Sequence, residues 1–251
     1  MDTMIDQGLD ATVAAFRAPP RPPMAANLDA GTLAALAAGG DEAAWRDVLD
    51  GLPLGPEDED EAARMATRLL PQAAAVLGDD WAEDRLSFVD VSIAAGRLHT
   101  ALRLLGARAA RAASDPAIPI LVPAWEQHVL AAAFAADRIC RAGRRGVVLA
   151  GLTAERAGAL PLVRDAEAVL ISFAERQAPR RVRDYVSTLR AALPARVTLL
   201  LGGPAFPSCH IDAYASADRV HATNDPVAAL RAAGLDLAPA PAPGRSATGA
   251  S

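Results

Sequence analysis

The sequence contains no lysine, only two cysteines and few aromatic residues, which make up 4% of its 251 positions. Hydrophobic residues nevertheless reach 52%, so alanine, leucine and valine must fill the core of a largely globular chain. Cys140 and Cys209 lie far apart and form no disulfide framework, which excludes the small disulfide-stapled class of protein.

The charge and hydropathy patterns exclude further classes. A net charge of -5 does not supply the concentrated basic surface that phosphate contacts need, so we expect no direct contact with DNA. No apolar run approaches the ~20 residues needed to cross a bilayer, so we expect no membrane association. The segment from Met1 to Phe16 has acidic residues and no basic start before an apolar stretch, which is unlike a signal peptide, and we expect a cytoplasmic protein.

The chain divides into four parts by composition. Residues 1–28 are dense in proline, which is unsuited to helix interiors and sheet ladders, and predict a disordered arm. Residues 237–251 are rich in alanine, proline, glycine and serine and predict a disordered tail. Between them, the pattern changes near Ser114-Asp-Pro116 and predicts a helical bundle over 29–113 and a second domain over 114–236.

The first of these domains is expected to contain only helices. Asp41 is placed to cap a helix over Glu42–Leu49, and acidic residues open a helix over Glu57–Leu70. Apolar residues recur at helical spacing over Leu86–Ala113, which predicts a long amphipathic helix.

The second domain alternates short apolar runs with helical patterns. The predicted strands are Ile118–Val122, Gly146–Ala150, Ala168–Ser172, Val197–Leu201 and Arg219–Ala222. The predicted helices are Val129–Ala142, Ala154–Val163, Pro179–Leu193, a short piece near Ile211–Ala215, and Asn224–Ala233. Apolar runs without alternation are typical of parallel strands buried on both faces. The pattern therefore predicts an α/β, Rossmann-like, five-stranded parallel sheet, with ligands bound at the carboxyl ends of its strands.

The loop after the first predicted strand carries a candidate metal ligand. His128 follows Glu126 by two residues, and a carboxylate that accepts a hydrogen bond from one ring nitrogen fixes the tautomer of an imidazole that ligates through the other. The alternative is that His128 is a helix N-terminal residue with only local hydrogen bonds.

Two further loops at strand ends carry polar or small residues. Ser172 ends the third strand and could donate to a ligand or cap the next helix. Gly202 and Gly203 end the fourth strand, where they could admit a bulky ligand or only permit a turn.

Together these loops resemble the cobalamin-binding Rossmann domains, which carry Asp-x-His-x-x-Gly, Ser-x-Leu and Gly-Gly after the first, third and fourth strands. The corresponding motifs here are Glu126-x-His128-x-x-Ala131, Ser172-x-Ala174 and Gly202-Gly203. The resemblance implies that His128 is the lower ligand to cobalt and that Glu126 orients it. It also implies that Ser172, Gly202 and Gly203 line a slot for the displaced nucleotide tail.

Three departures from the family pattern leave alternatives open. Glu126 is longer than aspartate, Ala131 adds a methyl group near the slot, and Ala174 removes bulk. A weakened site, a haem in place of cobalamin, or a protein-binding scaffold without cofactor are the corresponding alternatives.

The helical part carries a second resemblance. The segment Gly78–Val91, with Trp81 in Trp-x-x-Asp-x-x-Ser-Phe-Val-Asp-Val, looks most like the AerR/PpaA antirepressors of phototrophic bacteria. In related proteins the tryptophan packs over the upper face of the corrin, and CarH-type photoreceptors place an upper-ligand histidine eleven residues later, where this chain has Ser92. His99, two turns further on, is a weaker candidate ligand; the ordinary alternative for Trp81 is a core aromatic.

The resemblance implies a cobalamin-binding, non-enzymatic regulator of transcription that acts through a repressor-type partner. A corrinoid methyl carrier for a methyltransferase system is the alternative. Cys209-His210-x-Asp212 is a weak metal motif without a second cluster. Arg141, Arg144 and Arg145 predict a solvated basic face, with a partner contact as the alternative.

Overall fold

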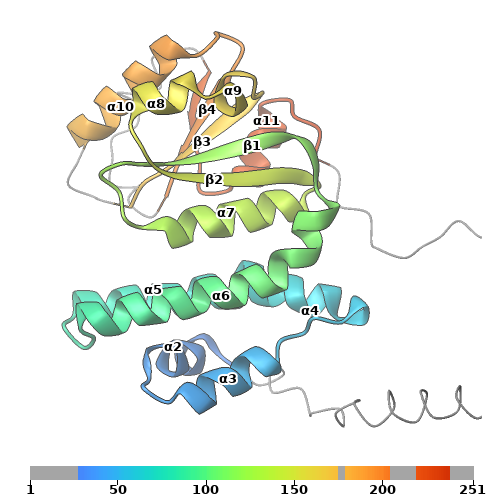
Figure 1. Cartoon of the computed structure of the whole chain (residues 1–251), viewed down its shortest axis with the longest axis vertical. Helices are drawn as coiled ribbons and strands as arrows, with labels where there is room; N and C mark the ends of the chain where they lie inside the picture. The colour runs from blue at the N-terminus through green and yellow to red at the C-terminus, as the bar shows by residue number, and fades with distance from the viewer. Residues whose placement is uncertain (1–27, 175–178, 204–218, 238–251) are drawn as a thin grey trace, which may run out of the picture.

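The computed structural model describes residues 28–174, 179–203 and 219–237. Helices precede a sheet, and the two parts lie against each other, with one helix of the sheet part packed on the helical part, as Figure 1 shows. The helical part contains α2 (Ala30–Ala38), α3 (Glu42–Asp50), η2 (Pro56–Asp58), α4 (Glu59–Arg64), η3 (Met65–Leu69), α5 (Leu70–Ala82) and α6 (Phe88–Ala112).

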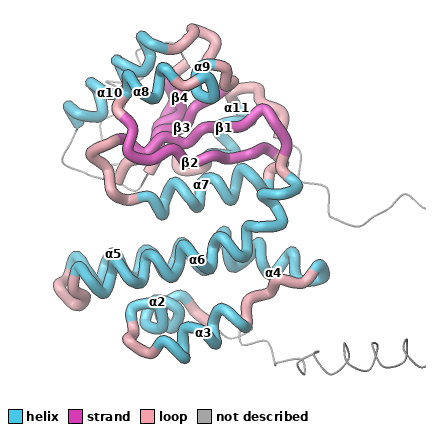
Figure 2. The backbone as a smooth tube through the Cα atoms, viewed as in Figure 1, coloured by secondary structure: helices cyan, strands magenta, loops and turns pink. Residues whose placement is uncertain are grey.

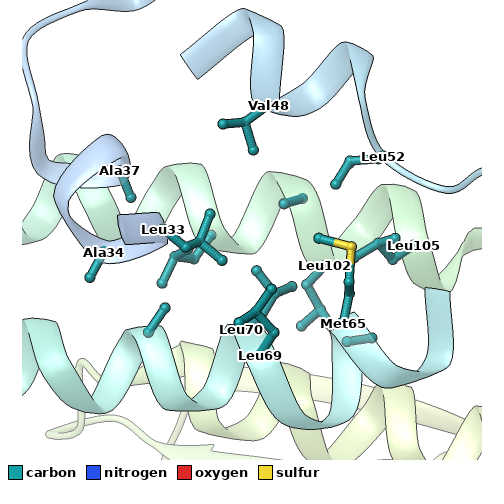
Figure 3. Packing of buried hydrophobic residues seen from close by; sticks show 14 of the residues in the cluster. Leu33, Ala34, Ala37, Val48, Leu52, Met65, Leu69, Leu70, Leu102 and Leu105 are labelled. Carbon is teal, nitrogen blue, oxygen red and sulfur yellow. The ribbon is translucent and has the colours of Figure 1, made fainter. Parts of the chain in front are cut away.

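Side-chain caps define where the helices of this part begin. Asp29 accepts from the Thr32 N–H at 2.8 Å, and Asp41 caps α3 as the sequence predicts. Ser87 and Asp90 form a capping box that starts α6. Large apolar side chains from α2, α3, η3, α5 and α6 then meet in one core, part of which Figure 3 shows: Leu33, Val48, Met65, Leu70, Leu102 and Leu105.

The predicted end of the second helix at Leu70 is wrong, because the helix continues through Ala82. Pro71 has no N–H, and its ring would collide with the carbonyl of Thr67 in a regular α-helix. A π-helical turn precedes it, in which the Leu70 N–H bonds to Met65 O, and this wider turn accommodates the proline.

The second part is a five-stranded parallel sheet, which confirms the predicted fold. Its strands are β1 (Ser114–Pro123), β2 (Arg144–Leu152), β3 (Ala168–Ser172), β4 (Thr198–Gly202) and β5 (Val220–Ala222). They are ordered β2-β1-β3-β4-β5, and every adjacent pair is parallel. The reversal of strand order beside β1 places a topological switch point at the carboxyl ends, which is where such sheets bind ligands.

Helices cover both faces of the sheet, seen as cyan tubes around magenta strands in Figure 2. One face packs against α7 (Val129–Arg141) and α11 (Pro226–Ala232) through a core that includes Ile120, Leu170 and Leu200. The other face packs against α8 (Ala154–Ala159), α9 (Pro161–Arg164) and α10 (Pro179–Ala192).

The predicted single helix over Ala154–Val163 is two helices in the structure. Leu160 is extended, with φ -73° and ψ 128°, because the ring of Pro161 disfavours the α conformation in the residue before it. Pro161 then opens α9 at a position where a missing N–H costs nothing.

A buried polar junction joins the two parts, and it corrects the prediction of a solvated basic face. Arg141 on α7 donates to Asp137 at 2.8 Å, to Glu59 of α4 at 3.3 Å and to the carbonyl of Leu105 on α6 at 2.9 Å. Burial raises the pKa of Asp137, and the Arg141 guanidinium opposes that shift.

The other two arginines of that cluster also have partners. Arg144 is buried and donates to Pro116 O and Glu167, while Arg145 remains half exposed and pairs with Asp115. Two of the three side chains therefore stabilise the fold from inside and are not free for a partner.

Several predictions fall outside the described residues. These are the arm, the tail beyond Leu237, the short helix near Ile211–Ala215 and the Cys209-His210-x-Asp212 motif. Within the three described ranges, no helix has the length and hydropathy that crossing a bilayer requires.

Candidate functional site

The loop after β1 holds an imidazole against a buried carboxylate. His128 is the N-cap residue of α7, but its side chain makes no capping bond. Its backbone N–H donates to Glu126 Oε1 at 2.9 Å, and its ring Nδ1 lies 2.5 Å from the same oxygen. The second oxygen of Glu126 accepts a hydrogen bond from the N–H of Ala174, in the loop after β3, at 2.7 Å.

This arrangement orients the ring and leaves one nitrogen available. The Glu126 side chain is 1% exposed and the His128 side chain 58% exposed, so the carboxylate is fixed while the imidazole projects toward solvent. With the hydrogen of Nδ1 donated to the carboxylate, the lone pair is on Nε2, which suits ligation. The local hydrogen bonds of the second interpretation of His128 are therefore present. The same bonds give the ring the orientation that ligation through Nε2 would need.

An aromatic pair packs the same loop against the α10 side of the sheet. The Trp125 ring packs edge-on against Tyr185 of α10, with ring centroids 5.3 Å apart. Burial, with a smaller effect of the Glu155 charge, raises the pKa of Tyr185 to about 12. Within the described residues, neither Trp125 Nε1 nor the Tyr185 hydroxyl has a hydrogen-bond partner.

A slot opens beside this loop, between the sheet, α7 and α11. Its volume is about 310 Å³, at the lower end of the range for small-molecule pockets. It contains Ser172, Gly202 and Gly203, the three residues that the sequence assigns to a slot. The remaining lining residues are Thr67, Pro71, Ile120, Ala131, Phe134, Ala135, Arg138, Leu170, Ile171, Leu200, Thr223, Asn224 and Pro226.

Ser172 does not cap a helix, which corrects the simpler of its two interpretations. It is buried at the end of β3, in register with Gly202 of β4, and α10 begins seven residues later. Its hydroxyl is therefore at the slot and not at a helix end.

The two glycines are required by the backbone as well as by the slot. Gly203 has φ +125°, and a Cβ there would collide with the carbonyl oxygen of Phe173. A Cβ on Gly202 would lie 2.8 Å from the carbonyl oxygen of Thr223. The backbone therefore requires glycine at both positions, and both also line the slot, where a ligand role stays a prediction.

The two alanines that depart from the cobalamin-binding family pattern, Ala131 and Ala174, have different structural consequences. Ala131 lines the slot, so its methyl group takes space from any ligand there. Ala174 contributes its backbone N–H to Glu126, a bond that is independent of the side chain at this position.

Trp81 lies in the last turn of α5 and is 46% exposed, so it is not a core aromatic. Figure 1 shows the α5–α6 turn on the side of the molecule where β1 ends and α7 begins. Three more apolar side chains at this corner were not predicted as site residues: Phe88, Val89 and Ile93, which are 68%, 62% and 48% exposed. His99 is half-buried further along α6, and the Ser92 hydroxyl donates to Phe88 O at 2.6 Å.

Helical geometry gives the direction of Phe88. Gly106 of α6 packs so tightly on α7 that a Cβ there would collide with Asp137. Phe88 precedes Gly106 by 18 residues, about five full turns, so it points along the same face of α6. That spacing spans about 27 Å, whereas α7 reaches back only eight residues from Asp137, about 12 Å. Phe88 therefore extends beyond the start of α7. In the sequence, the signal that could have identified this position is a phenylalanine directly after Ser87, the capping residue of α6.

The described residues contain no group of three His, Cys, Asp or Glu side chains placed to hold a metal ion. The candidate ligand among them is His128, which Glu126 orients and which precedes the slot residue Ala131 by three positions.

The fold is an α/β Rossmann-like domain preceded by helices, and it is similar to the fold of corrinoid proteins of known structure. The structure is similar to the monomethylamine corrinoid protein of Methanosarcina barkeri, with a TM-score of 0.54 and 14% identity over 81% of this chain and 94% of that one. A cobalamin-binding protein from Desulfitobacterium hafniense matches with a TM-score of 0.37 and 17% identity over 82% and 98% of the two chains, which is too low a score to add to the argument.

One relative is similar in sequence. It is an uncharacterized 20.5 kDa protein of Rhodobacter capsulatus, encoded in the bchF-crtJ intergenic region. The two are 28% identical over 165 residues, which cover 64% of this chain and 85% of that protein. No protein-family model matches the chain.

Proposed function

We propose that this chain is a cobalamin-binding regulatory protein of the AerR/PpaA antirepressor type, which acts on transcription through a partner repressor and has no catalytic activity of its own. The observation that carries the proposal is the oriented imidazole of His128 one helical turn before the slot residue Ala131. Bound cobalamin would supply a cobalt ion that exchanges ligands. His128 Nε2 would ligate the metal, and Ser172 with the glycine pair would hold the nucleotide tail in the slot.

The slot also gives the ligand a means to act on the helical part. Thr67 and Pro71, at the π-helical turn, form part of its wall, while the remaining walls belong to the α/β part. A tail in the slot contacts both parts and so favours one arrangement of them over others, which is the condition for ligand control of a partner surface. The relative encoded between bchF and crtJ agrees with a regulator of that gene region.

A corrinoid methyl carrier is the second candidate function. The specific observation in its favour is the fold shared with the monomethylamine corrinoid protein. A methyl carrier and a regulator would both need a ligand on the lower face of the corrin and a site for its tail. His128 and the slot therefore do not distinguish the two functions.

The cofactor is tested by reconstitution. The purified protein is mixed with hydroxocobalamin or with haem, freed of excess by gel filtration, and its visible spectrum recorded. We expect coelution with cobalamin, and a changed spectrum with weaker binding for His128→Ala. A Soret band after incubation with haem, together with no retained cobalamin, would show that haem and not cobalamin is the cofactor. A colourless protein after both incubations would contradict the proposal.

A slot-filling variant tests the position of the tail. Ala131→Leu places three more carbon atoms in the slot, and we expect at least about tenfold weaker cobalamin binding. Ala110→Leu, on an exposed position of α6, is the matched control and should bind like wild type. Equal binding by both variants would exclude this slot as the tail site.

The regulatory role is tested with a repressor encoded near this gene. We expect the cobalamin-loaded protein to release that repressor from labelled operator DNA, without itself shifting the DNA. Demethylation of methylcobalamin-loaded protein by a partner methyltransferase, with no effect on repressor binding, would favour the carrier instead.

A further inference from the structure

The slot has an apolar interior with one charged side chain. Its floor is formed by Ile120, Leu170 and Leu200, which are buried on the α7 side of the sheet. Ser172 marks the end at the strand tips. Among the described lining residues Arg138 alone carries a charge.

Arg138 lies on the side of α7 that lines the slot, and its guanidinium reaches Asp225, which follows the carboxyl end of β5. Arg138 follows Ala131 by seven residues on α7, two turns on the same face and about 10 Å along the axis. Ala135, between them, also lines the slot, so the lining is continuous. A ligand segment that enters beside Ala131 and runs along α7 reaches the guanidinium.

The guanidinium is held in place from the opposite wall. Arg138 Nη2 lies 3.0 Å from Asp225 Oδ1. The same Asp225 oxygen accepts from the N–H groups of Val227 and Ala228, at 3.0 and 3.1 Å, which fixes it as the N-cap of α11. Although desolvation opposes the shift, the Ala228 N–H and the Arg138 charge keep the pKa of Asp225 below its usual value, so the pair is ionised at neutral pH.

An arginine has five N–H donors and no acceptor, so an ion pair with one carboxylate oxygen leaves most of them unused. With its side chain 35% exposed and facing an apolar slot, the guanidinium is suited to donate to an acceptor on a bound ligand. The base of a cobalamin tail has such an acceptor when His128 replaces it on the metal, namely the ring nitrogen that would otherwise bind cobalt.

We propose that Arg138 is a specificity-determining residue that donates a hydrogen bond to the nucleotide tail of the corrinoid inside the slot. The inference rests on the proposed function, because it concerns how the same site selects its ligand. It predicts that the chain discriminates corrinoids with a tail from those without one.

The experiment compares hydroxocobalamin with cobinamide, which has the same ring and metal but no nucleotide tail. Dissociation constants are measured by absorbance titration for wild type, Arg138→Leu and Asp225→Asn. We expect Arg138→Leu to weaken hydroxocobalamin binding by about tenfold to a hundredfold, as expected for a lost charge-assisted hydrogen bond, and to change cobinamide binding by less than about threefold. Asp225→Asn keeps a capping side chain but loses the charge that holds the guanidinium, so it should weaken hydroxocobalamin binding by less than Arg138→Leu does and leave cobinamide binding unchanged.

Each other outcome is decisive. Equal loss for both corrinoids in Arg138→Leu, or a lowered melting temperature larger than that of the matched surface variant Arg145→Leu, assigns Arg138 a structural role and overturns the inference. Unchanged hydroxocobalamin binding also overturns it while the proposed function stands. If the wild-type protein binds neither corrinoid, the proposed function fails and the inference fails with it.

Discussion

The buried carboxylate of Glu126 provides the sharpest test of the site, because its role can be measured without any ligand. Among the described residues, three donors converge on it: the His128 N–H at 2.9 Å, the His128 ring at 2.5 Å and the Ala174 N–H at 2.7 Å. Glu126→Gln has the same shape but one acceptor oxygen. If that oxygen keeps the contacts to His128, the new NH₂ group faces the Ala174 N–H, and two buried donors oppose each other.

The expected loss follows from these contacts. A hydrogen bond to a charged group contributes about 1.5–3 kcal/mol, of which a neutral amide acceptor keeps a part, and a buried donor left without an acceptor costs about 1–3 kcal/mol. We therefore expect Glu126→Gln to lower the free energy of unfolding by about 2–4 kcal/mol. For a chain of this size, each kcal/mol corresponds to about 2–4 °C in melting temperature, so the shift should be about 5–15 °C.

The assay is thermal unfolding of the ligand-free protein followed by circular dichroism. His128→Ala is the matched control, since it removes the ring contact of a side chain that is 58% exposed but leaves both backbone donors on the carboxylate, so the loss should stay at the lower end, about 1.5 kcal/mol or 3–6 °C. Glu126→Asp keeps the charge on a shorter arm and should fall between the two. A Glu126→Gln melting temperature within 1 °C or so of wild type, or an equal loss in His128→Ala, would refute the reasoning.

Three further predictions concern the surroundings of the site. Gly203→Ala should lower the free energy of unfolding, measured in urea, by at least about 2 kcal/mol, because it adds a collision to an unfavourable φ. The control Gly151→Ala, at φ +74° with open space around it, should cost only about 1 kcal/mol. Equal costs for the two variants would contradict this prediction. Tyr185→Phe should be neutral or stabilising at pH 7 by about 1 kcal/mol, since its hydroxyl is buried without a partner among the described residues; a clear loss would refute it. Because the folded-state pKa of Tyr185 is raised to about 12 from 10.0, wild-type stability should be complete below pH 10 and fall between pH 10 and 12, and Tyr185→Phe should reduce that fall in urea midpoints measured across the range. Gly106→Ala should displace the Asp137 carboxylate from its pair with Arg141 and lower the melting temperature more than Gly96→Ala, which has open space.

The sequence predicts most of the fold because strand and helix periods are local. The run Ala168–Ser172 coincides with β3, and α3 follows its Asp41 cap. The errors occur at prolines, where backbone geometry outweighs side-chain periodicity. A π turn carries the helix past Pro71, and Pro161 divides a helix in two.

The sequence also places the residues of the candidate site that lie close together along the chain. Glu126 and His128 are two positions apart, so their hydrogen bond follows from a short loop at a strand end. The contact from Ala174 to Glu126 joins residues 48 positions apart, and no local pattern indicates it.

By itself, then, the sequence determined the order of the elements, the parallel sheet and the loops at its carboxyl edge, because each depends on the period of apolar residues over a few turns or one strand. Only the tertiary structure decided that Arg141 is buried at a junction, that Arg138 faces a slot, and that Thr67 and Pro71 form part of its wall. An arginine in an amphipathic helix has the same local pattern whether it meets water, a carboxylate or a cavity. Which of these it meets depends on packing between segments that are distant in the chain.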